Sequence, residues 1–154
     1  RATYLMLTGL GCHTLAAVRE LVGLPVEIES VSVQGDHVIV VLRYKDFLAV
    51  YEILNDQDVV QFDAAIEIYQ HDRRMKVKYE TPYLRYQPQC FEVIESTKED
   101  TKTTLYGPDY RDPFEAEVLY YHDCIQQGKQ PKSDFADAMA DLKLFRDIAL
   151  KVKE

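Results

Sequence analysis

The sequence predicts an α+β fold, with a mostly antiparallel sheet of about six strands and helices on one face of that sheet. Period-two alternation of apolar and polar residues fills the middle of the chain, between about residues 31 and 106, and is typical of antiparallel strands with one packed face. Apolar stripes at helical spacing stand before and after this region. The order of one helix, several strands and two helices is typical of a helix layer on one sheet.

The first helix is expected from about Gly9 to Val22. Thr8 can cap its free backbone N–H groups, Gly23 suits the left-handed position after its last turn, and Pro25 prevents its continuation. The residues expected on its apolar face are Leu15, Val18, Leu21 and Val22. The residues expected away from that face are Arg19 and Glu20.

The strands are expected in hairpin pairs after a short first strand. They are Val31–Val33, Val38–Tyr44, Phe47–Ile53, Asp63–His71, Met75–Glu80, Cys90–Thr97 and Thr101–Tyr106. The turns between paired strands are predicted at Lys45-Asp46, Arg73-Arg74 and Glu99-Asp100. The segment Thr81–Gln89 carries Pro82 and Pro88 and is expected to cross the sheet without forming a strand.

Two helices close the chain. The first is expected to begin with Asp112 as its cap and Glu115 at its third position, close to a capping box, and to end at Gly128. Its expected apolar face is Phe114, Val118, Tyr121 and Ile125.

The last helix is expected from near Ser133, with Asp134 and Asp137 favourable in its first turn. Its periodicity predicts one buried stripe along the whole helix. The residues of that stripe are Phe135, Ala138, Met139, Leu142, Phe145, Ala149 and Val152.

Composition limits the class of protein. The 154 residues, 47% of them hydrophobic, are expected to form a single domain over residues 1–154. The net charge of −8 argues against a nucleic-acid partner and against an anionic membrane surface. No apolar run is expected to approach the roughly 18 residues of a membrane span.

The three cysteines, Cys12, Cys90 and Cys124, are too widely spaced for a disulfide framework. They are expected to be reduced thiols of a cytoplasmic protein. The neighbours His122-Asp123-Cys124 would point in different directions from a helix, so no metal site is expected.

Two stretches carry a family resemblance. One is Tyr4-Leu-Met-Leu-Thr-Gly-Leu-Gly-Cys-His13, and the other runs from Phe114 through Tyr121-His122-Asp123-Cys124 to Pro131. Together they resemble the C-terminal domain of the glucose-fructose oxidoreductase / inositol dehydrogenase (Gfo/Idh/MocA) family. The resemblance implies a substrate-binding and oligomerisation domain of an NAD(P)-dependent oxidoreductase that acts on a sugar or polyol.

The chain has no Gly-x-Gly-x-x-Gly turn between a strand and a helix, which a dinucleotide pyrophosphate would need. The family's N-terminal Rossmann domain is therefore expected to be absent from this chain. NAD or NADP is expected to bind the intact parent protein, and not this chain alone. A lysine that the family uses in catalysis would lie in the missing domain.

The resemblance gives His13 the role of acid/base on the substrate hydroxyl, for which imidazole is suited near neutral pH. A partly exposed histidine without a role is the alternative. Gly9 and Gly11 could allow close approach of the cofactor, or could only loosen the helix entry. Thr8 and Cys12 share that turn and are expected to line the same cleft.

A second group of candidates lies later in the chain. In the resembled family the segment before the penultimate helix lies near the substrate cleft, which makes Tyr110 and Arg111 candidate substrate contacts. Another group is Tyr79, Tyr83, Arg85 and Tyr86. These aromatic and basic residues could bind a sugar, or could cover a sheet edge or a subunit interface.

Two departures from the family keep a second hypothesis open. Gly9 and Ala16 stand where the family commonly has acids beside the histidine. The alternative is thus a non-catalytic ligand-binding or scaffolding module of the same fold. A small free-standing enzyme is a weaker alternative, because no complete nucleophile or acid/base set is present.

The central hairpin predicts a homodimer through the sheet. Its residues Val38, Val40 and Leu42 alternate with Ile39 and Val41, so both of its faces are apolar. Helices can cover only one face, and the other needs a second covering.

Overall fold

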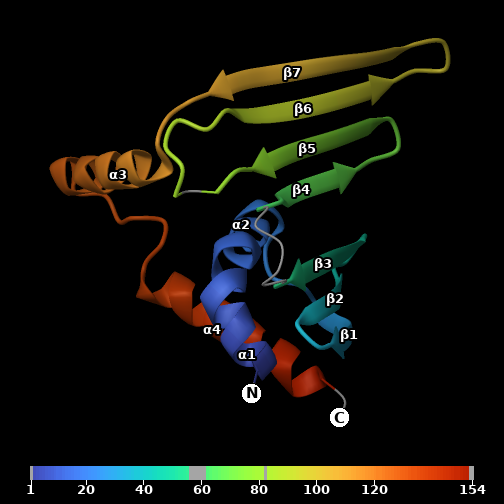
Figure 1. Ribbon diagram of the computed structural model, residues 1–154, viewed down its shortest axis with the longest axis vertical. Helices are drawn as coiled ribbons and strands as arrows, with labels where there is room; N and C mark the ends of the chain where they lie inside the picture. Colours follow the sequence, from blue (N-terminus) through green and yellow to red (C-terminus); the bar gives the residue numbers. More distant parts are fainter. Residues whose placement is uncertain (1, 56–61, 82, 153–154) are drawn as a thin grey trace. The chain divides into compact units, whose positions relative to one another are not determined.

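The computed structural model describes residues 2–55, 62–81 and 83–152 (Figure 1). The chain divides into two compact units, one of Arg1–Val59 with Lys132–Glu154 and one of Val60–Pro131. The α+β class and the antiparallel pairing are as predicted. The described strands form two sheets, of three and four strands, in place of the expected single sheet of about six. Each unit is described by itself below.

The first unit contains β1 (Glu27–Gln34), β2 (His37–Arg43) and β3 (Leu48–Leu54), in that order in the sheet. The predicted hairpin is confirmed, because the Tyr44 N–H donates to the Phe47 carbonyl across Lys45-Asp46 at 2.9 Å. The Tyr44 and Phe47 rings stack with centroids 4.5 Å apart. On one face of β2, Val38, Val40 and Leu42 are completely buried. That face is the base of the hydrophobic core.

The helices of the first unit cover this face. The chain forms α1 (Ala2–Met6), one turn of π-helix η1 (Leu7–Gly11) and α2 (Cys12–Val22), and later α4 (Phe135–Lys151). The core residues that these helices supply are Leu7, Leu15, Leu144, Phe145 and Ile148. Each of these side chains is at most 7% exposed, so this layer holds most of the apolar burial that stabilises the unit.

The predicted helix start at Gly9 is wrong, because the helix runs without a break from Ala2. Thr8 is therefore not a cap, and its hydroxyl donates to the carbonyl of Tyr4 one turn earlier, at 3.0 Å. The predicted end is confirmed: Gly23 has φ +79° and its N–H donates to the Arg19 carbonyl.

By length and composition alone, the helix Ala2–Val22 is long and apolar enough to cross a membrane. This corrects the expectation that no apolar run approaches that length. Leu7 and Leu15 from this helix are nevertheless 0% and 1% exposed in the core of the first unit. One stripe of this helix therefore packs into the core, while most of its residues stay at least partly exposed.

Of the predicted apolar stripe of α4, Phe145 is buried and Ala149 and Val152 are half-buried, while the other four residues are exposed. Phe135 is 94% exposed and Met139 51% exposed. The buried stripe is instead Asp141, Leu144, Phe145 and Ile148. An aspartate can lie on it because Arg19 neutralises it: the Arg19 Nε donates to Asp141 Oδ1 at 2.7 Å.

Arg19 is thus on the packed side of α2, contrary to prediction. Its guanidinium also contacts Asp137 Oδ1 at 2.7 Å. The Asp141 carboxylate, helped by Asp137, raises the pKa of Arg19 further above its ordinary value. A guanidinium can serve both carboxylates because it presents several N–H donors in one plane.

The second unit contains β4 (Ala64–Tyr69), β5 (Arg73–Tyr79), β6 (Gln89–Ser96), β7 (Thr101–Asp109) and α3 (Pro113–Gln127), with the strands in sequence order (Figure 1). The bend before β7 is confirmed, since the Thr97 N–H donates to the Asp100 carbonyl at 2.8 Å. The predicted turn at Arg73-Arg74 is wrong by two residues. The turn lies at His71-Asp72, and both arginines belong to β5, where they pair with Glu95 and Glu67.

The segment between β5 and β6 forms no strand, as predicted; Pro82 lies outside the described residues. The cap of α3 is also as predicted, because the Asp112 carboxylate accepts from the backbone N–H groups of Phe114 and Glu115. Gly128 ends this helix with φ +60°. The predicted apolar face of α3 is not covered: Val118, Tyr121 and Ile125 are 67%, 58% and 63% exposed.

The two faces of the second sheet differ in character. One face carries a charged cluster in which Glu67 accepts from Lys76 at 2.8 Å and from Arg74 at 2.6 Å. The hydrogen bond from Lys76, with those from Tyr69 and Arg74, lowers the pKa of Glu67 to about 2. The register places apolar residues on the other face: Ala64, Ile66, Ile68, Met75, Val77, Tyr79, Phe91, Val93 and Tyr106. None of these is fully buried.

Replacement of Arg19 by methionine is expected to lower the free energy of unfolding by about 2–4 kcal/mol, because it leaves two carboxylates unpaired against α2. Urea unfolding followed by circular dichroism measures the change. The matched control is Arg146→Met, since Arg146 pairs with Asp147 on the exposed side of α4; its effect should stay below about 0.5 kcal/mol. Equal effects of the two substitutions would contradict the assigned role of Arg19.

Candidate functional site

The predicted site residues of the first unit lie on the helix Ala2–Val22, but on different sides of it. Gly9 and His13 are four residues apart and both exposed, together with Leu5, which is 60% exposed. Residues four apart on a helix share a face. Leu7, Gly11 and Leu15 form the opposite, buried stripe. The structure therefore brings Gly9 and His13 together on an open surface and places Gly11 in the core.

His13 lies in the middle of the continuous helix Ala2–Val22. The prediction had placed it near the start of a helix that begins at Gly9. Within the described part of the chain, no residue forms a hydrogen bond or ion pair with its imidazole. The side chain is exposed, so both ring nitrogens are open to a ligand. None of the described residues of this unit holds the ring in one orientation.

The helix is locally modified just before His13. The residues Leu7–Gly11 form one turn of π-helix, a feature that is frequent at functional sites. A methyl group placed on Gly9 would meet no atom within 4 Å. The surface beside His13 is thus unobstructed, with room for a planar group to approach the backbone.

Thr8 and Cys12 are half-buried, and both direct their polar atoms at the helix itself. The Thr8 hydroxyl donates to the Tyr4 and Leu5 carbonyls at 3.0 and 3.2 Å. The Cys12 thiol contacts the Gly9 carbonyl at 3.8 Å. A ligand would have to replace these interactions to bind either group.

Gly11 is closely packed. A methyl group at this position would lie 3.1 Å from the Tyr51 hydroxyl and 3.4 Å from Leu7 Cδ2. The Tyr51 hydroxyl shares a hydrogen bond of 3.1 Å with Thr14. Burial raises the pKa of the Tyr51 phenol, an effect that the bond with Thr14 partly offsets.

Sequence reasoning missed the hydrogen-bonded pair Tyr51 and Thr14, in which the Tyr51 hydroxyl lies beside Gly11 of the π-helical turn. A signal was available for Tyr51, because it pairs in register with the buried Val40. Directly paired residues of neighbouring strands share a face of the sheet. No signal in the sequence pointed to Thr14.

The other two predicted contacts belong to the second unit. Tyr110 is 53% exposed and lies between β7 and α3. The Arg111 guanidinium folds back on Asp109, with a shortest contact of 2.6 Å. The hydrogen bonds from Arg111 lower the pKa of Asp109 to about 2. Arg111 is 79% exposed along its side chain and keeps donors that face solvent.

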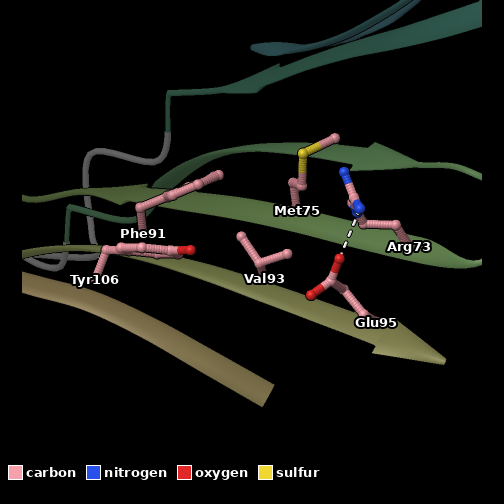
Figure 2. A pocket seen from close by; sticks show the side chains of 6 residues that line it. All are labelled: Arg73, Met75, Phe91, Val93, Glu95 and Tyr106. Atoms are coloured by element: carbon pink, nitrogen blue, oxygen red, sulfur yellow. Dashed lines mark hydrogen bonds and ion pairs between the residues drawn. The ribbon is translucent and has the colours of Figure 1, made fainter. Parts of the chain in front are cut away.

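The apolar face of the second sheet is hollowed (Figure 2). The hollow has a volume of about 450 Å³ and is lined by Arg73, Met75, Phe91, Val93, Glu95 and Tyr106. The Phe91 and Tyr106 rings lie side by side at one end, with centroids 5.8 Å apart. Arg73 and Glu95 pair at 2.6 Å at the other end. None of the predicted site residues lines this hollow.

The fold is shared with half of several larger proteins. The candidate oxidoreductase yvaA from Bacillus subtilis matches with a TM-score of 0.72 and 14% identity over 95% of this chain and 48% of that one. The candidate oxidoreductase YPO2259 from Yersinia pestis matches with a TM-score of 0.69 and 15% identity, over 95% of this chain and 47% of that one. A third, the candidate oxidoreductase yhhX, matches with a TM-score of 0.67 and 14% identity, over 96% of this chain and 48% of that one.

This chain spans about half the length of the solved structures that it matches. At 14–15% identity the likeness establishes the fold alone. No protein-family model matches the sequence, and no curated protein matches it either.

The two glycines of the π-turn are expected to respond differently to alanine. Gly9→Ala should raise the free energy of unfolding by about 1 kcal/mol, because alanine favours the helix and has free space there. Gly11→Ala should be less stable than Gly9→Ala by about 1–2 kcal/mol, since its methyl group presses on Tyr51. Adding Tyr51→Phe should recover part of that loss. Equal stabilisation by both alanines in urea titrations would refute the packing role of Gly11.

Proposed function

We propose that this chain is the substrate-binding half of an NAD(P)-dependent oxidoreductase that acts on a sugar or polyol, as the resemblance to the Gfo/Idh/MocA family implies. The observation that carries the proposal is the fold match: nearly all of this chain corresponds to about half of each of three candidate oxidoreductases. A nucleotide-binding domain would supply the remaining half. We place the protein in the cytoplasm, in keeping with three free cysteines.

In this proposal a nicotinamide ring would lie against the exposed helix face at His13, where no described atom lies within 4 Å of a methyl group placed on Gly9. The bound dinucleotide would accept the hydride from the carbinol carbon of the substrate. His13 would take the proton of the same hydroxyl, which leaves a carbonyl group as product. The imidazole is exposed and has no competing partner among the residues that the structure describes, which leaves it open to the substrate.

A non-catalytic module of the same fold is the second candidate. The observation that favours it is the absence of a carboxylate beside His13, where Gly9 and Ala16 occupy the positions one turn away. Without such a partner the imidazole is not held in one orientation, and general-base catalysis depends on that geometry. The protein would then bind its ligand without turning it over.

The complete natural polypeptide that contains this chain is the material for the test. Assayed with NAD and NADP on a panel of sugars and polyols, it should oxidise at least one of them. His13→Asn should lower kcat by about 10²-fold or more with little change in KM, since it removes the proton acceptor. The control is His71→Asn, at an exposed turn position, which should leave kcat within about twofold.

Gly9→Asp separates the two candidates. It adds a carboxylate one turn before His13, where the helix has space for it. A rise in kcat indicates a catalytic histidine that lacks its orienting partner. Leu10→Asp adds the same charge at a neighbouring exposed position and should not raise kcat. If the wild type and Gly9→Asp are both inactive on the whole panel with both nucleotides, the redox function is rejected and the non-catalytic module is supported.

We also propose that a second copy of the chain covers the apolar face of the second sheet. The second face of the central hairpin, with Ile39 and Val41, was the predicted dimer surface; both residues are half-buried and lie outside the core cluster. The second sheet offers a broader apolar face, since no helix covers Met75, Phe91 or Val93 within the described residues of the second unit. The row Arg73–Glu95–Lys102 crosses that face with alternating charge. Alternating charge suits a two-fold contact, in which the same patch meets itself.

Light scattering at micromolar concentration should give about twice the chain mass of 17.9 kDa. Val93→Glu should convert the dimer to a monomer, because it places a charge in the middle of the apolar face (Figure 2). Thr103→Glu is the control, at an exposed position of β7 on the opposite face. A monomeric wild type, or a dimer that survives Val93→Glu, would rule out this surface.

A further inference from the structure

A second surface is assembled from two loops of the second unit. One is the loop Tyr83–Tyr86 between β5 and β6, and the other is the segment from Tyr110 to Asp112 that leads into α3 (Figure 1). An ion pair joins them: Arg85 Nε lies 3.7 Å from Asp112 Oδ2. The other carboxylate oxygen of Asp112 caps α3. The start of this helix therefore anchors the loop.

The aromatic residues of this surface face solvent. Tyr83, Tyr86 and Tyr110 are 85%, 62% and 53% exposed. The three stand in two loops that the Arg85–Asp112 pair links, and tyrosine is enriched where a protein binds a partner or ligand.

The backbone of the loop is also held in an uncommon conformation. Tyr86 has φ +58°, the only positive φ among the described residues other than glycine. A bulky side chain in the left-handed region is unfavourable, and such residues concentrate at binding sites. The arrangement fixes the direction in which the Tyr86 ring leaves the loop.

The charges of the surface are balanced. Arg85 is paired with Asp112, and Arg111 is paired with Asp109. Both guanidinium side chains are nevertheless 78–79% exposed and keep free N–H donors. A site for an anionic ligand would be expected to contain more arginines than acidic residues. Paired donors and acceptors beside aromatic rings suit a neutral ligand with several hydroxyl groups, whose C–H faces stack on the rings.

We propose that Tyr83, Arg85, Tyr86 and Tyr110 form a binding surface for a neutral sugar or polyol. The ligand class rests on the proposed function. Binding itself needs neither the nucleotide nor His13, because every group of the surface belongs to the second unit.

The test is a titration of the protein with D-glucose, D-fructose, myo-inositol and sorbitol in the absence of nucleotide, followed by calorimetry. At least one should bind saturably in the millimolar range or tighter. Tyr83→Ala and Arg85→Ala should each weaken that binding by about fivefold or more, as expected for loss of a stacking ring or a hydrogen-bonding fork. Circular dichroism shows whether each variant is folded.

Matched controls remove the same residue types elsewhere. Tyr121→Ala removes a tyrosine that is 58% exposed on α3, and Arg146→Ala removes an arginine paired with Asp147 on α4. Both should bind as the wild type does. Absence of saturable binding by all four ligands overturns the proposal. So does unchanged binding by Tyr83→Ala and Arg85→Ala.

The outcome separates this proposal from the redox function. Sugar binding that depends on Tyr83, in a full-length protein without NAD(P)-dependent turnover, keeps the surface and rejects the redox function. Turnover that depends on His13, in a protein whose sugar binding is unchanged by Tyr83→Ala and Arg85→Ala, keeps the function and rejects the surface. If Tyr83→Ala changes the mass in solution and no sugar binds, the tyrosines belong to a contact between protein chains and the proposal fails.

Discussion

The contact of Arg19 with Asp141 and Asp137 is the constraint on which the first unit depends. It fixes the rotation of α4 about its own axis, because an aspartate can lie at the packed side only where a guanidinium meets it. That rotation sends Leu144, Phe145 and Ile148 into the core. The same contact holds α2 with its Leu15 side on the sheet, and so turns the opposite side, with His13, toward solvent.

Local patterns in the sequence predict local structure well. The hairpin at Lys45-Asp46, the Asp112 cap and the Gly23 and Gly128 helix ends each depend on a few adjacent residues, and each is found. The errors have a different origin. Arg73 and Arg74 were assigned to a turn because two adjacent charges look solvent-exposed. In β5 they pair with Glu95 and Glu67 on neighbouring strands, and adjacent residues do not reveal these pairs. The buried face of α4 was misjudged for the same reason, since Asp141 can be buried only with its distant partner.

The candidate site shows the same division. Sequence and resemblance identified His13 and Gly9, and the structure places both on one open helix surface. They did not identify the packing of Gly11 against Tyr51, which requires knowing which strand lies beneath the helix. The pairing of Arg85 with Asp112 was equally hidden, because 27 positions separate the two numbers in the sequence. Ligand-binding surfaces assembled from separate loops are therefore where sequence reasoning is weakest.

The order of the units along the chain has a consequence for synthesis. The second unit, Val60–Pro131, is inserted between β3 and α4 of the first. During translation the second unit can emerge and fold while the first still lacks α4. Val38, Val40 and Leu42 of the early sheet then lack the part of their final cover that α4 supplies, until α4 leaves the ribosome. Aggregation or chaperone binding of the nascent chain would concentrate in that interval, and a slower rate of translation would lengthen it.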